Sequence, residues 1–176
     1  MKITLPQISI SPSNYKEKDC TAVVPGLEIP ARTVEIDSQA VTDLIKAARK
    51  AADNLYSVLD NKFPVGASVI MADDAEQIIH ASANMELSVL NSGICAERAL
   101  IHSMVGRGYR TIRHLAISLP KNLGKDLCFR SPCGACRQTI YEFADENTLI
   151  FVDRDPSLDS FEVIDIDRLL PYGYRL

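Results

Sequence analysis

Three cysteines and one glutamate, placed in two short motifs, have the types and spacing needed for a catalytic metal centre. The first motif is the tripeptide 95–97, Cys-Ala-Glu, and the second is the pentapeptide 132–136, Pro-Cys-Gly-Ala-Cys. Zinc in catalytic sites takes three protein ligands and keeps a fourth position for water or substrate. We expect Zn²⁺ as the cofactor and three thiolates as its ligands: Cys95, Cys133 and Cys136.

The positions of these residues on predicted helices favour this arrangement. Cys133 and Cys136 are three residues apart, so they share one face of a helical turn, and Cys95 opens a helix of its own. Helix N-termini and a bound metal both favour thiolate over thiol. Glu97 lies roughly 200° around the helix from Cys95, so it should not bind the same ion. It is better placed to exchange a proton with water at the open position.

A glutamate two residues after one ligand, followed by Pro-Cys-x-x-Cys, is typical of zinc enzymes that deaminate nucleobases. In such chemistry the metal polarises a water and the glutamate, here Glu97, moves the protons. Three thiolates give the Zn²⁺ cluster a formal charge near −1. Arg98 and Arg137 each directly follow a motif residue, and either could offset this charge by donating to the sulfurs.

A structural zinc site is the alternative interpretation of the cysteines. Structural sites usually have four protein ligands, and Cys128, five residues before Cys133, could supply the fourth. Nothing in such a site requires a glutamate at position 97, so the catalytic interpretation accounts for more of the pattern.

The composition of the chain limits which binding partners and which cellular compartment are expected. The chain has 176 residues, of which 47% are hydrophobic and 24% charged, which favours one catalytic domain. Its net charge is −4 and Lys/Arg runs are short, which argues against binding a nucleic acid polymer. No apolar run approaches about 18 residues, so no membrane span is expected. Five cysteines without a secretion signal indicate a reducing, cytoplasmic location.

The pattern of the chain separates an N-terminal arm from an α/β domain. Residues 1–36 contain four prolines and should be extended or partly disordered, whereas residues 37–176 form the deaminase domain. Hydrophobic periodicity in the domain predicts a helix, a hairpin and then alternating helices and strands. That order predicts a central sheet covered by helices on both faces. The predicted helices are 37–60, 95–105, 133–143 and 166–170, and the predicted strands are 65–72, 77–83, 112–118, 148–152 and 161–164.

From about residue 40 to its end, the sequence resembles the cytidine deaminase family in its short, three-cysteine form. The resemblance rests on blocks in family order, namely residues 63–67, 84–86, 95–98, 131–138 and 169–171. It implies a three-layer α-β-α fold with a five-stranded mixed sheet and one zinc per subunit. It also implies that Cys95, Cys133 and Cys136 bind the zinc and that Glu97 is the proton shuttle.

The same resemblance implies a set of substrate contacts. Asn84 and Glu86 match residues that bind the ribose 3′-hydroxyl, and Phe63 matches an aromatic that packs against the pyrimidine ring. Tyr174 falls where the family places an aromatic that reaches a neighbouring subunit's pocket. We also expect Ala96, between a ligand and the glutamate, to contact substrate. Short-form members are usually homotetramers, so a homo-oligomer is expected, with a tetramer favoured over a dimer.

Two departures from the family pattern leave more than one nucleoside as a candidate substrate. Leu90 stands where the family has a tyrosine, and the tail 172–174, Tyr-Gly-Tyr, is similar to that of blasticidin S deaminase. The expected reaction is hydrolytic deamination of cytidine and deoxycytidine, as in pyrimidine salvage. One alternative is deamination of a modified cytosine nucleoside of the blasticidin S kind. A second alternative is a non-catalytic zinc module used in assembly.

Overall fold

In the computed structural model, which describes residues 1–17 and 20–173, the chain divides into two units. The first unit is Met1–Asp37, and the second begins at Ser38. Every residue of the predicted metal site belongs to the second unit. Among the described residues, the structure contains no helix that is both long enough and apolar enough to cross a membrane.

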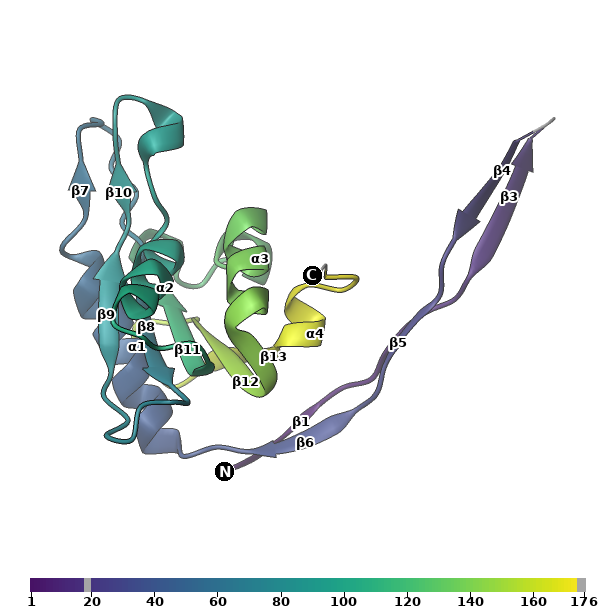
Figure 1. Ribbon diagram of the computed structural model, residues 1–176, viewed down its shortest axis with the longest axis horizontal. Coiled ribbons are helices and arrows are strands. Elements are labelled where there is room, and N and C mark those ends of the chain that lie inside the picture. The colour runs from purple at the N-terminus through teal and green to yellow at the C-terminus, as the bar shows by residue number, and fades with distance from the viewer. Residues whose placement is uncertain (18–19, 174–176) are drawn as a thin grey trace. The chain divides into compact units, whose positions relative to one another are not determined.

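The first unit is a two-stranded antiparallel ribbon (Figure 1). Strand β1 (Lys2–Leu5) pairs with β6 (Arg32–Glu35), β2 (Ile8–Ile10) with β5 (Leu27–Ile29), and β3 (Ser13–Glu17) with β4 (Cys20–Val24). The three pairs keep a single register, from Lys2 opposite Glu35 to Glu17 opposite Cys20. The breaks between the strands hold the prolines of the arm, which cannot donate to a ladder: Pro6, Pro12, Pro25 and Pro30.

The ribbon segment nearest the N-terminus has one polar face. Lys2 forms a 3.0 Å ion pair with Glu35, and the hydroxyls of Thr4 and Thr33 lie 3.2 Å apart. Ile3 and Leu5 alternate with these polar residues, which is the period of a strand. Each proline interrupts the alternation of polar and apolar residues. Each alternating stretch is therefore too short to be recognised as a strand from the sequence alone. The described strands of the arm are paired with one another along its length.

The second unit is built on a sheet that, within the described residues, has five strands in the order β13-β12-β11-β8-β9. Neighbouring strands are antiparallel except β11 and β12, so the sheet is mixed, as expected. The strands are β8 (Gly66–Met71), β9 (His80–Ala83), β11 (Ile112–Ser118), β12 (Ala144–Asp153) and β13 (Phe161–Asp165).

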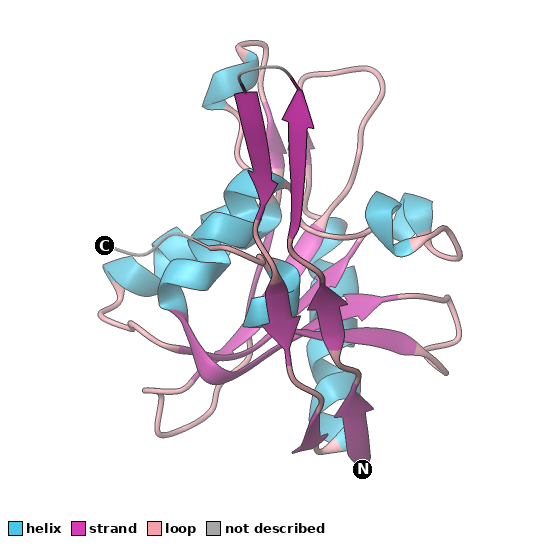
Figure 2. Cartoon of the chain, turned by 90° about the vertical axis from the view of Figure 1, so that its right-hand side faces the viewer, coloured by secondary structure: helices cyan, strands magenta, loops and turns pink. Residues whose placement is uncertain are grey.

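Helices cover both faces of this sheet, which confirms the three-layer α-β-α fold (Figure 2). On one face, α1 (Ser38–Ala52) packs through buried residues such as Leu44, whose carbonyl accepts a 2.6 Å hydrogen bond from Ser68 of β8. On the other face, Val69 and Leu115 join a core with α2 (Ala96–Gly106), α3 (Gly134–Phe143) and α4 (Ile166–Leu169).

The first helix is shorter than predicted, and this is a correction. The sequence predicts a helix over 37–60, but α1 ends at Ala52 and a turn follows at Asp53 and Asn54. Leu55 continues the helical spacing by coincidence. The next residues form β7 (Tyr56–Ser57), which pairs in parallel with β10 (Met85–Glu86). This pairing brings the segment before residue 63 beside the segment after residue 84.

The remaining predicted helices and strands are present, most of them with ends that differ from the prediction by a few residues. The strand over 112–118 has the predicted bounds, whereas the strand predicted over 77–83 begins only at His80. The loop predicted over 119–131 contains two short 3₁₀ turns, η2 (Pro120–Asn122) and η3 (Leu127–Phe129), and a third, η1 (Leu90–Ser92), precedes α2. These turns lie next to the residues that the following subsection describes.

Candidate active site

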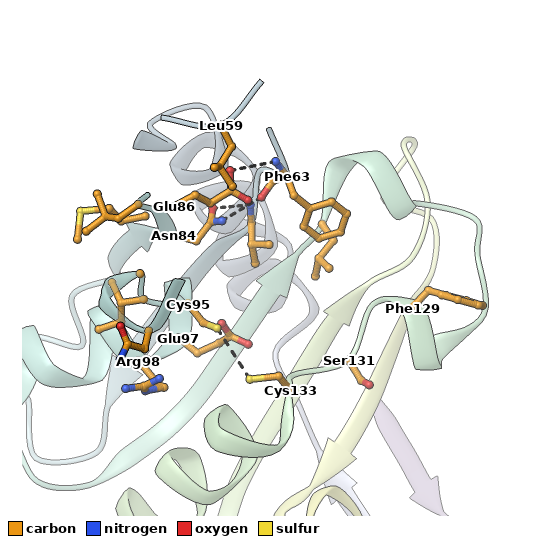
Figure 3. Close-up of a pocket in the computed structure, with 17 residues that line it drawn as sticks. Leu59, Phe63, Asn84, Glu86, Cys95, Glu97, Arg98, Phe129, Ser131 and Cys133 are labelled. Atoms are coloured by element: carbon orange, nitrogen blue, oxygen red, sulfur yellow. Dashed lines mark hydrogen bonds between the residues drawn. The ribbon is translucent and has the colours of Figure 1, made fainter. Parts of the chain in front are cut away.

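The three cysteines meet where two helices begin. Cys95 is the N-cap residue of α2 and Cys133 that of α3, both with extended backbone, and Cys136 lies in the first turn of α3. Their sulfur atoms all lie within 4.8 Å of one another. The Sγ–Sγ distance is 3.8 Å between Cys95 and Cys133, a contact that Figure 3 shows as a dashed line. It is 3.4 Å between Cys133 and Cys136. The local sequence produces this convergence because the residue that opens each helix is a cysteine.

This sulfur cluster fits a zinc ion. Tetrahedral Zn²⁺ with Zn–S bonds of about 2.3 Å requires sulfurs roughly 3.8 Å apart, close to the separations observed. Cys128, the candidate fourth ligand of a structural site, is exposed in η3 and does not belong to the cluster. Among the residues that the structure describes, three thiolate donors without a fourth match the donor set of a catalytic site rather than that of a structural one.

The environment of the cluster shifts the pKa of Cys95 and that of Cys136 in opposite directions. Hydrogen bonds from Cys136 and Cys133 lower the pKa of Cys95 to about 6, and the positive charge of Arg98 contributes in the same direction. The contact with Cys95 and burial together raise the pKa of Cys136. At neutral pH the cluster therefore already favours one thiolate, at Cys95, which is the form that a metal ion requires.

Glu97 lies beside the sulfurs with its carboxyl group buried. Its side chain is only 3% exposed, and Figure 3 shows the carboxylate next to Cys95 and Cys133. Burial, reinforced by the negative charge of Cys95, raises the pKa of Glu97 to about 7. Its Oε2 atom has no hydrogen-bond partner within the part of the chain that the structure describes. A buried carboxyl oxygen without a partner is poised to take up or release a proton.

A cavity of about 720 Å³ opens in front of this carboxylate. Its size is that of a small-molecule site, and mostly apolar walls surround a few polar groups. The polar and charged residues that line it, apart from the cysteines, are Asn84, Glu86, Asn91, Glu97, Arg98 and Ser131. The apolar residues that line it are Leu59, Phe63, Val65, Met85, Leu87, Ile94, Leu119 and Phe129.

Asn84 and Glu86 both face the segment that carries Phe63. The Asn84 amide donates to the Phe63 carbonyl at 2.9 Å and accepts from the Val65 amide at 2.9 Å. The Glu86 carboxylate accepts from the Phe63 amide at 3.4 Å. The structure thus brings the three residues together in the pocket, and it shows that Asn84 and Glu86 also hold the wall of the pocket in place.

Other residues expected at the site differ in how they are placed. Ala96 is fully buried and is not among the described residues that line the pocket, whereas Phe63 is 39% exposed at the pocket wall. Arg98 lines the pocket and supplies positive charge near Cys95, with no hydrogen bond to a sulfur among the residues described. Tyr174 lies outside the described residues, as does the side chain of Leu90.

Arg137, the second candidate donor to the sulfurs, forms hydrogen bonds with the residues that precede Cys133. Its guanidinium donates to the carbonyl of Pro132 and to the hydroxyl of Ser131, both at 2.9 Å. It therefore fixes the segment that leads into Cys133 instead of contacting the cluster.

Sequence reasoning missed part of the pocket wall. Leu59, Asn91 and Phe129 line the cavity from segments that lack any chemical motif. The only signal for Ser131 is its place directly before the Pro-Cys motif. These residues come to the pocket through the course of the 3₁₀ turns and of β7, which local patterns do not encode.

A three-layer fold with three sulfurs and a buried glutamate at the floor of a pocket defines a zinc-dependent deaminase. Residues 38–152 match the model of the family described as "cytidine and deoxycytidylate deaminase zinc-binding region". The chain belongs to this family. The matched residues include the sulfur cluster and Glu97 and begin where the ribbon ends.

Named relatives agree with the family model. A cytidine deaminase of Mycoplasma genitalium is 33% identical over 134 residues, which are 75% of this chain and 93% of the relative. A cytidine deaminase of Sporosarcina psychrophila is 35% identical over 112 residues, 64% of this chain and 76% of the relative. These relatives favour neither the blasticidin-type deaminase nor the non-catalytic module.

Solved structures show the same fold. The crystal structure of cytidine deaminase from Burkholderia pseudomallei has a TM-score of 0.62 at 25% identity, covering 75% of this chain and 97% of that chain. The enzyme from Mycobacterium tuberculosis has a TM-score of 0.60 at 25% identity, covering 81% of this chain and 100% of that chain. The fold predicted from the resemblance is therefore confirmed.

Proposed function

We propose that this protein hydrolyses cytidine and deoxycytidine to uridine and deoxyuridine, with release of ammonia. The observation that carries the proposal is the Glu97 carboxyl, buried with an unpartnered oxygen beside three clustered sulfurs at the floor of a pocket. The names of the relatives support the same substrate class. In the reaction the bond from the ring carbon to the exocyclic nitrogen breaks, and a bond from the same carbon to a water oxygen forms.

Zinc would be held by Cys95, Cys133 and Cys136, whose sulfurs have the required spacing. When bound, the ion supplies Lewis acidity, which lowers the pKa of a water molecule and makes it a nucleophile near neutral pH. The protein contributes the geometry, since two helix starts and the first turn of α3 fix where the sulfurs lie.

Glu97 moves the protons. Its carboxylate accepts a proton from the attacking water and delivers it to the ring nitrogen. It then accepts the remaining proton of the new hydroxyl group and delivers it to the departing amine, which leaves as ammonia while the ring carbon becomes a carbonyl. A pKa of about 7 suits this task, because the group is then able both to accept and to donate at neutral pH. The apolar lining of the pocket excludes bulk water and so strengthens these transfers.

The substrate would be held by residues of the wall opposite Glu97. We assign Phe63 to the pyrimidine ring and Asn84 and Glu86 to the ribose 3′-hydroxyl. The Asn84 amide has a second N–H besides the one used on the Phe63 carbonyl, and a carboxylate can accept several hydrogen bonds. Three further residues complete the assignment: Ala96 as a substrate contact, Arg98 as the charge that offsets the thiolates, and Tyr174 as a contact with a neighbouring subunit's pocket.

We further propose a homo-oligomer, with a tetramer favoured over a dimer. Large apolar side chains near the pocket are exposed in the single chain, among them Tyr56, Val58 and Phe129 at 58%, 47% and 59%. Exposed apolar groups of this kind mark interaction surfaces. Light scattering coupled to size-exclusion chromatography measures the number of subunits. We also propose a reducing cytoplasmic compartment, because the ligand cysteines must stay reduced. A role in pyrimidine salvage is proposed from the expected reaction.

The test is ultraviolet-monitored deamination by zinc-loaded protein. The panel holds cytidine, deoxycytidine, cytosine, cytidine monophosphate and blasticidin S. We expect turnover of the first two, and we expect Glu97→Gln to abolish it while zinc content stays at one per chain. Glu142→Gln, an exposed glutamate on α3, is the matched control and should behave as wild type.

Other outcomes separate the alternatives. Turnover of blasticidin S alone would assign the protein to the antibiotic-type deaminases. Zinc binding without turnover of any compound in the panel, in a folded oligomer, would favour the non-catalytic assembly module.

A further inference from the structure

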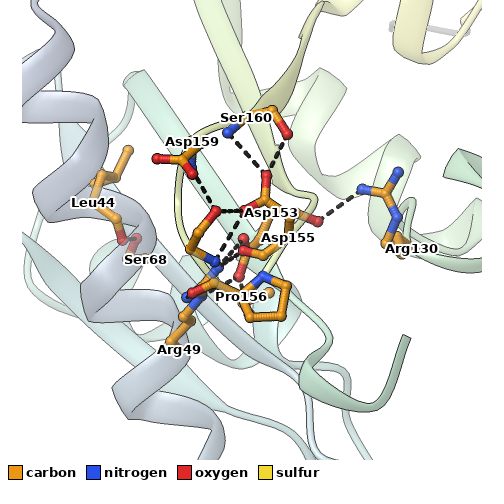
Figure 4. A network of polar contacts seen from close by, with 11 residues as sticks. Leu44, Arg49, Ser68, Arg130, Asp153, Asp155, Pro156, Asp159 and Ser160 are labelled. Carbon is orange, nitrogen blue, oxygen red and sulfur yellow. Dashed lines mark hydrogen bonds and ion pairs between the residues drawn. The ribbon is translucent and has the colours of Figure 1, made fainter. Parts of the chain in front are cut away.

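Arg130 is a buried arginine three residues before the ligand Cys133. It is 1% exposed, and all three nitrogens of its guanidinium donate hydrogen bonds. Nε donates to the Lys125 carbonyl at 2.7 Å. Nη1 donates to the Asp153 carbonyl at 2.7 Å, a contact that Figure 4 shows. Nη1 and Nη2 also donate to the two carboxylate oxygens of Glu162 at 2.6 and 2.5 Å. A bidentate arginine–carboxylate pair of this kind is both strong and directional.

These contacts connect the segment 119–131 to the sheet. Lys125 belongs to that segment, Asp153 ends β12, and Glu162 lies in β13, the neighbouring strand. The guanidinium therefore joins the segment to two strands at once. A buried arginine left without its carboxylate is costly, so the ion pair with Glu162 opposes any movement of the segment away from the strands.

The segment is also fixed at other points. The Asn122 amide donates to the Phe129 carbonyl at 2.6 Å, and Arg137 of α3 holds Ser131 and Pro132. Between these points the chain carries Phe129 and Ser131 to the pocket wall. It then enters Cys133, the residue at which α3 begins.

Cys133 depends on this segment more than the other two ligands do. Cys136 is fully buried within α3, and Cys95 is partly buried at the start of α2. Cys133 is exposed and stands at the junction between the segment and the helix. Its sulfur position is consequently set by the chain that precedes it.

We propose that Arg130, paired with Glu162, is a positioning residue for the metal centre. It holds the segment before α3 so that the Cys133 sulfur meets those of Cys95 and Cys136 without rearrangement. The inference rests on the zinc site of the proposed function, and it adds a residue that touches neither metal nor substrate. Partners that orient ligands in this indirect way typically contribute about 10- to 100-fold to metal affinity.

The test compares Arg130→Met with Arg154→Gln in the full-length protein. Arg154 is the matched control, because its side chain is 57% exposed and its Nε lies 4.0 Å from the same Glu162 carboxylate. Zinc affinity is measured by competition with a chromophoric chelator, and the cobalt-substituted protein gives the thiolate-to-cobalt absorption bands. We expect Arg130→Met to bind zinc about 10- to 100-fold more weakly with altered cobalt bands, and Arg154→Gln to match wild type.

Glu162→Gln is the second variant, in case Arg130→Met does not fold. It keeps the side-chain volume and one acceptor oxygen, and we expect a smaller loss of zinc affinity than in Arg130→Met. A folded variant of either kind with wild-type affinity and wild-type cobalt bands overturns the positioning role. If wild-type protein itself binds no zinc, the proposed metal site is wrong. If it binds zinc but deaminates nothing, only the proposed reaction fails, because affinity and spectra do not depend on turnover.

Discussion

The side chain of Asn84 is bound at both ends to the pocket wall that carries Phe63. Its amide nitrogen donates to the Phe63 carbonyl and its oxygen accepts from the Val65 amide, each at 2.9 Å. The residue is 9% exposed, so little of its surface is free to do anything else. Any role of Asn84 toward a substrate sugar is therefore combined with a structural one, and a substitution should affect both.

We expect Asn84→Ala to raise KM about tenfold or more while zinc content stays at the wild-type level. The physical reason is that the Phe63 carbonyl and the Val65 amide both lose their partner, which costs about 1–3 kcal/mol for each buried group. Steady-state kinetics and metal analysis are the measurements. Asn91→Ala removes an exposed asparagine that lines the same cavity and is the control. An unchanged KM in Asn84→Ala would contradict the wall-holding role.

Metal-free Glu97→Gln should be more stable than metal-free wild type at alkaline pH. Burial raises the pKa of Glu97 to about 7 from its ordinary value of 4.5, so the folded state disfavours the ionised carboxylate. The contribution of Glu97 to the stability of wild type is highest while the group is protonated, falls as pH rises from about 4.5 to about 7, and then levels off. Glutamine does not ionise and avoids this loss, which amounts to about 3 kcal/mol above pH 7.

Urea unfolding of both metal-free proteins at pH 4.5 and pH 8 measures this difference. The gap between variant and wild type should be near zero at the lower pH and open at the higher one. Glu142→Gln, on the exposed face of α3, should show no such dependence. A gap of the same size at both pH values would mean that ionisation of Glu97 is not the cause.

Gly66→Ala should destabilise the protein by about 3 kcal/mol or prevent folding. A Cβ atom at this position would lie 1.8 Å from the Ala48 carbonyl oxygen and 2.7 Å from the Ala52 nitrogen. Both are backbone atoms of α1, so helix and strand would have to separate, as in an overpacked core. Gly106→Ala is the control, because a Cβ there meets nothing within 4 Å. Thermal unfolding of the two variants should differ clearly.

Asp153→Asn should cost about 3–5 kcal/mol of stability. The Asp153 carboxylate is 1% exposed and accepts from Nε and Nη2 of Arg49 at 2.6 and 2.7 Å and from the Ser118 hydroxyl at 2.7 Å (Figure 4). Neutralising it leaves the arginine without its counter-charge. Asp159→Asn, in an exposed loop nearby, is the comparison. Equal denaturation midpoints for the two variants would show that the buried pair contributes nothing.

Removal of residues 1–36 should leave zinc binding and deamination in place. All the described residues that line the cavity lie in the second unit, and the matched family region begins at residue 38. We therefore propose residues 37–176 as the deaminase domain and the ribbon as an accessory arm. Metal analysis, kinetics and light scattering on the shortened protein are the measurements. Loss of zinc binding in a folded truncation would assign the arm to the catalytic unit.

The sequence was sufficient for the two halves of the sulfur site because each half is local. The meeting of Cys95 with Cys133, 38 residues apart, is a tertiary contact that the pairing of the two motifs indicated. A cysteine opens each helix, two cysteines share one turn, and Glu97 follows Cys95 on the same helix. Local spacing fixes such relationships before any tertiary contact forms. The fold class followed from the order of helices and strands, which is likewise a property of neighbouring residues.

What the sequence did not reveal depends on long-range contacts. The guanidinium of Arg130 meets Glu162 across 32 residues, and that of Arg49 meets Asp153 across 104. No local pattern distinguishes these arginines from exposed ones. At Leu55 a local pattern was misleading. Its spacing fits a continued helix, but α1 ends at Ala52.

The prolines of the ribbon bear on the solubility of the protein. Each ribbon strand is paired on one edge only among the described residues, and an open strand edge is a template for aggregation. The described strands are three to five residues long, with prolines in the breaks between them. Amyloid-like stacking needs about six or seven uninterrupted residues. Each described strand of the ribbon is therefore shorter than the uninterrupted segment that fibril formation needs, even though one edge of the strand is unpaired.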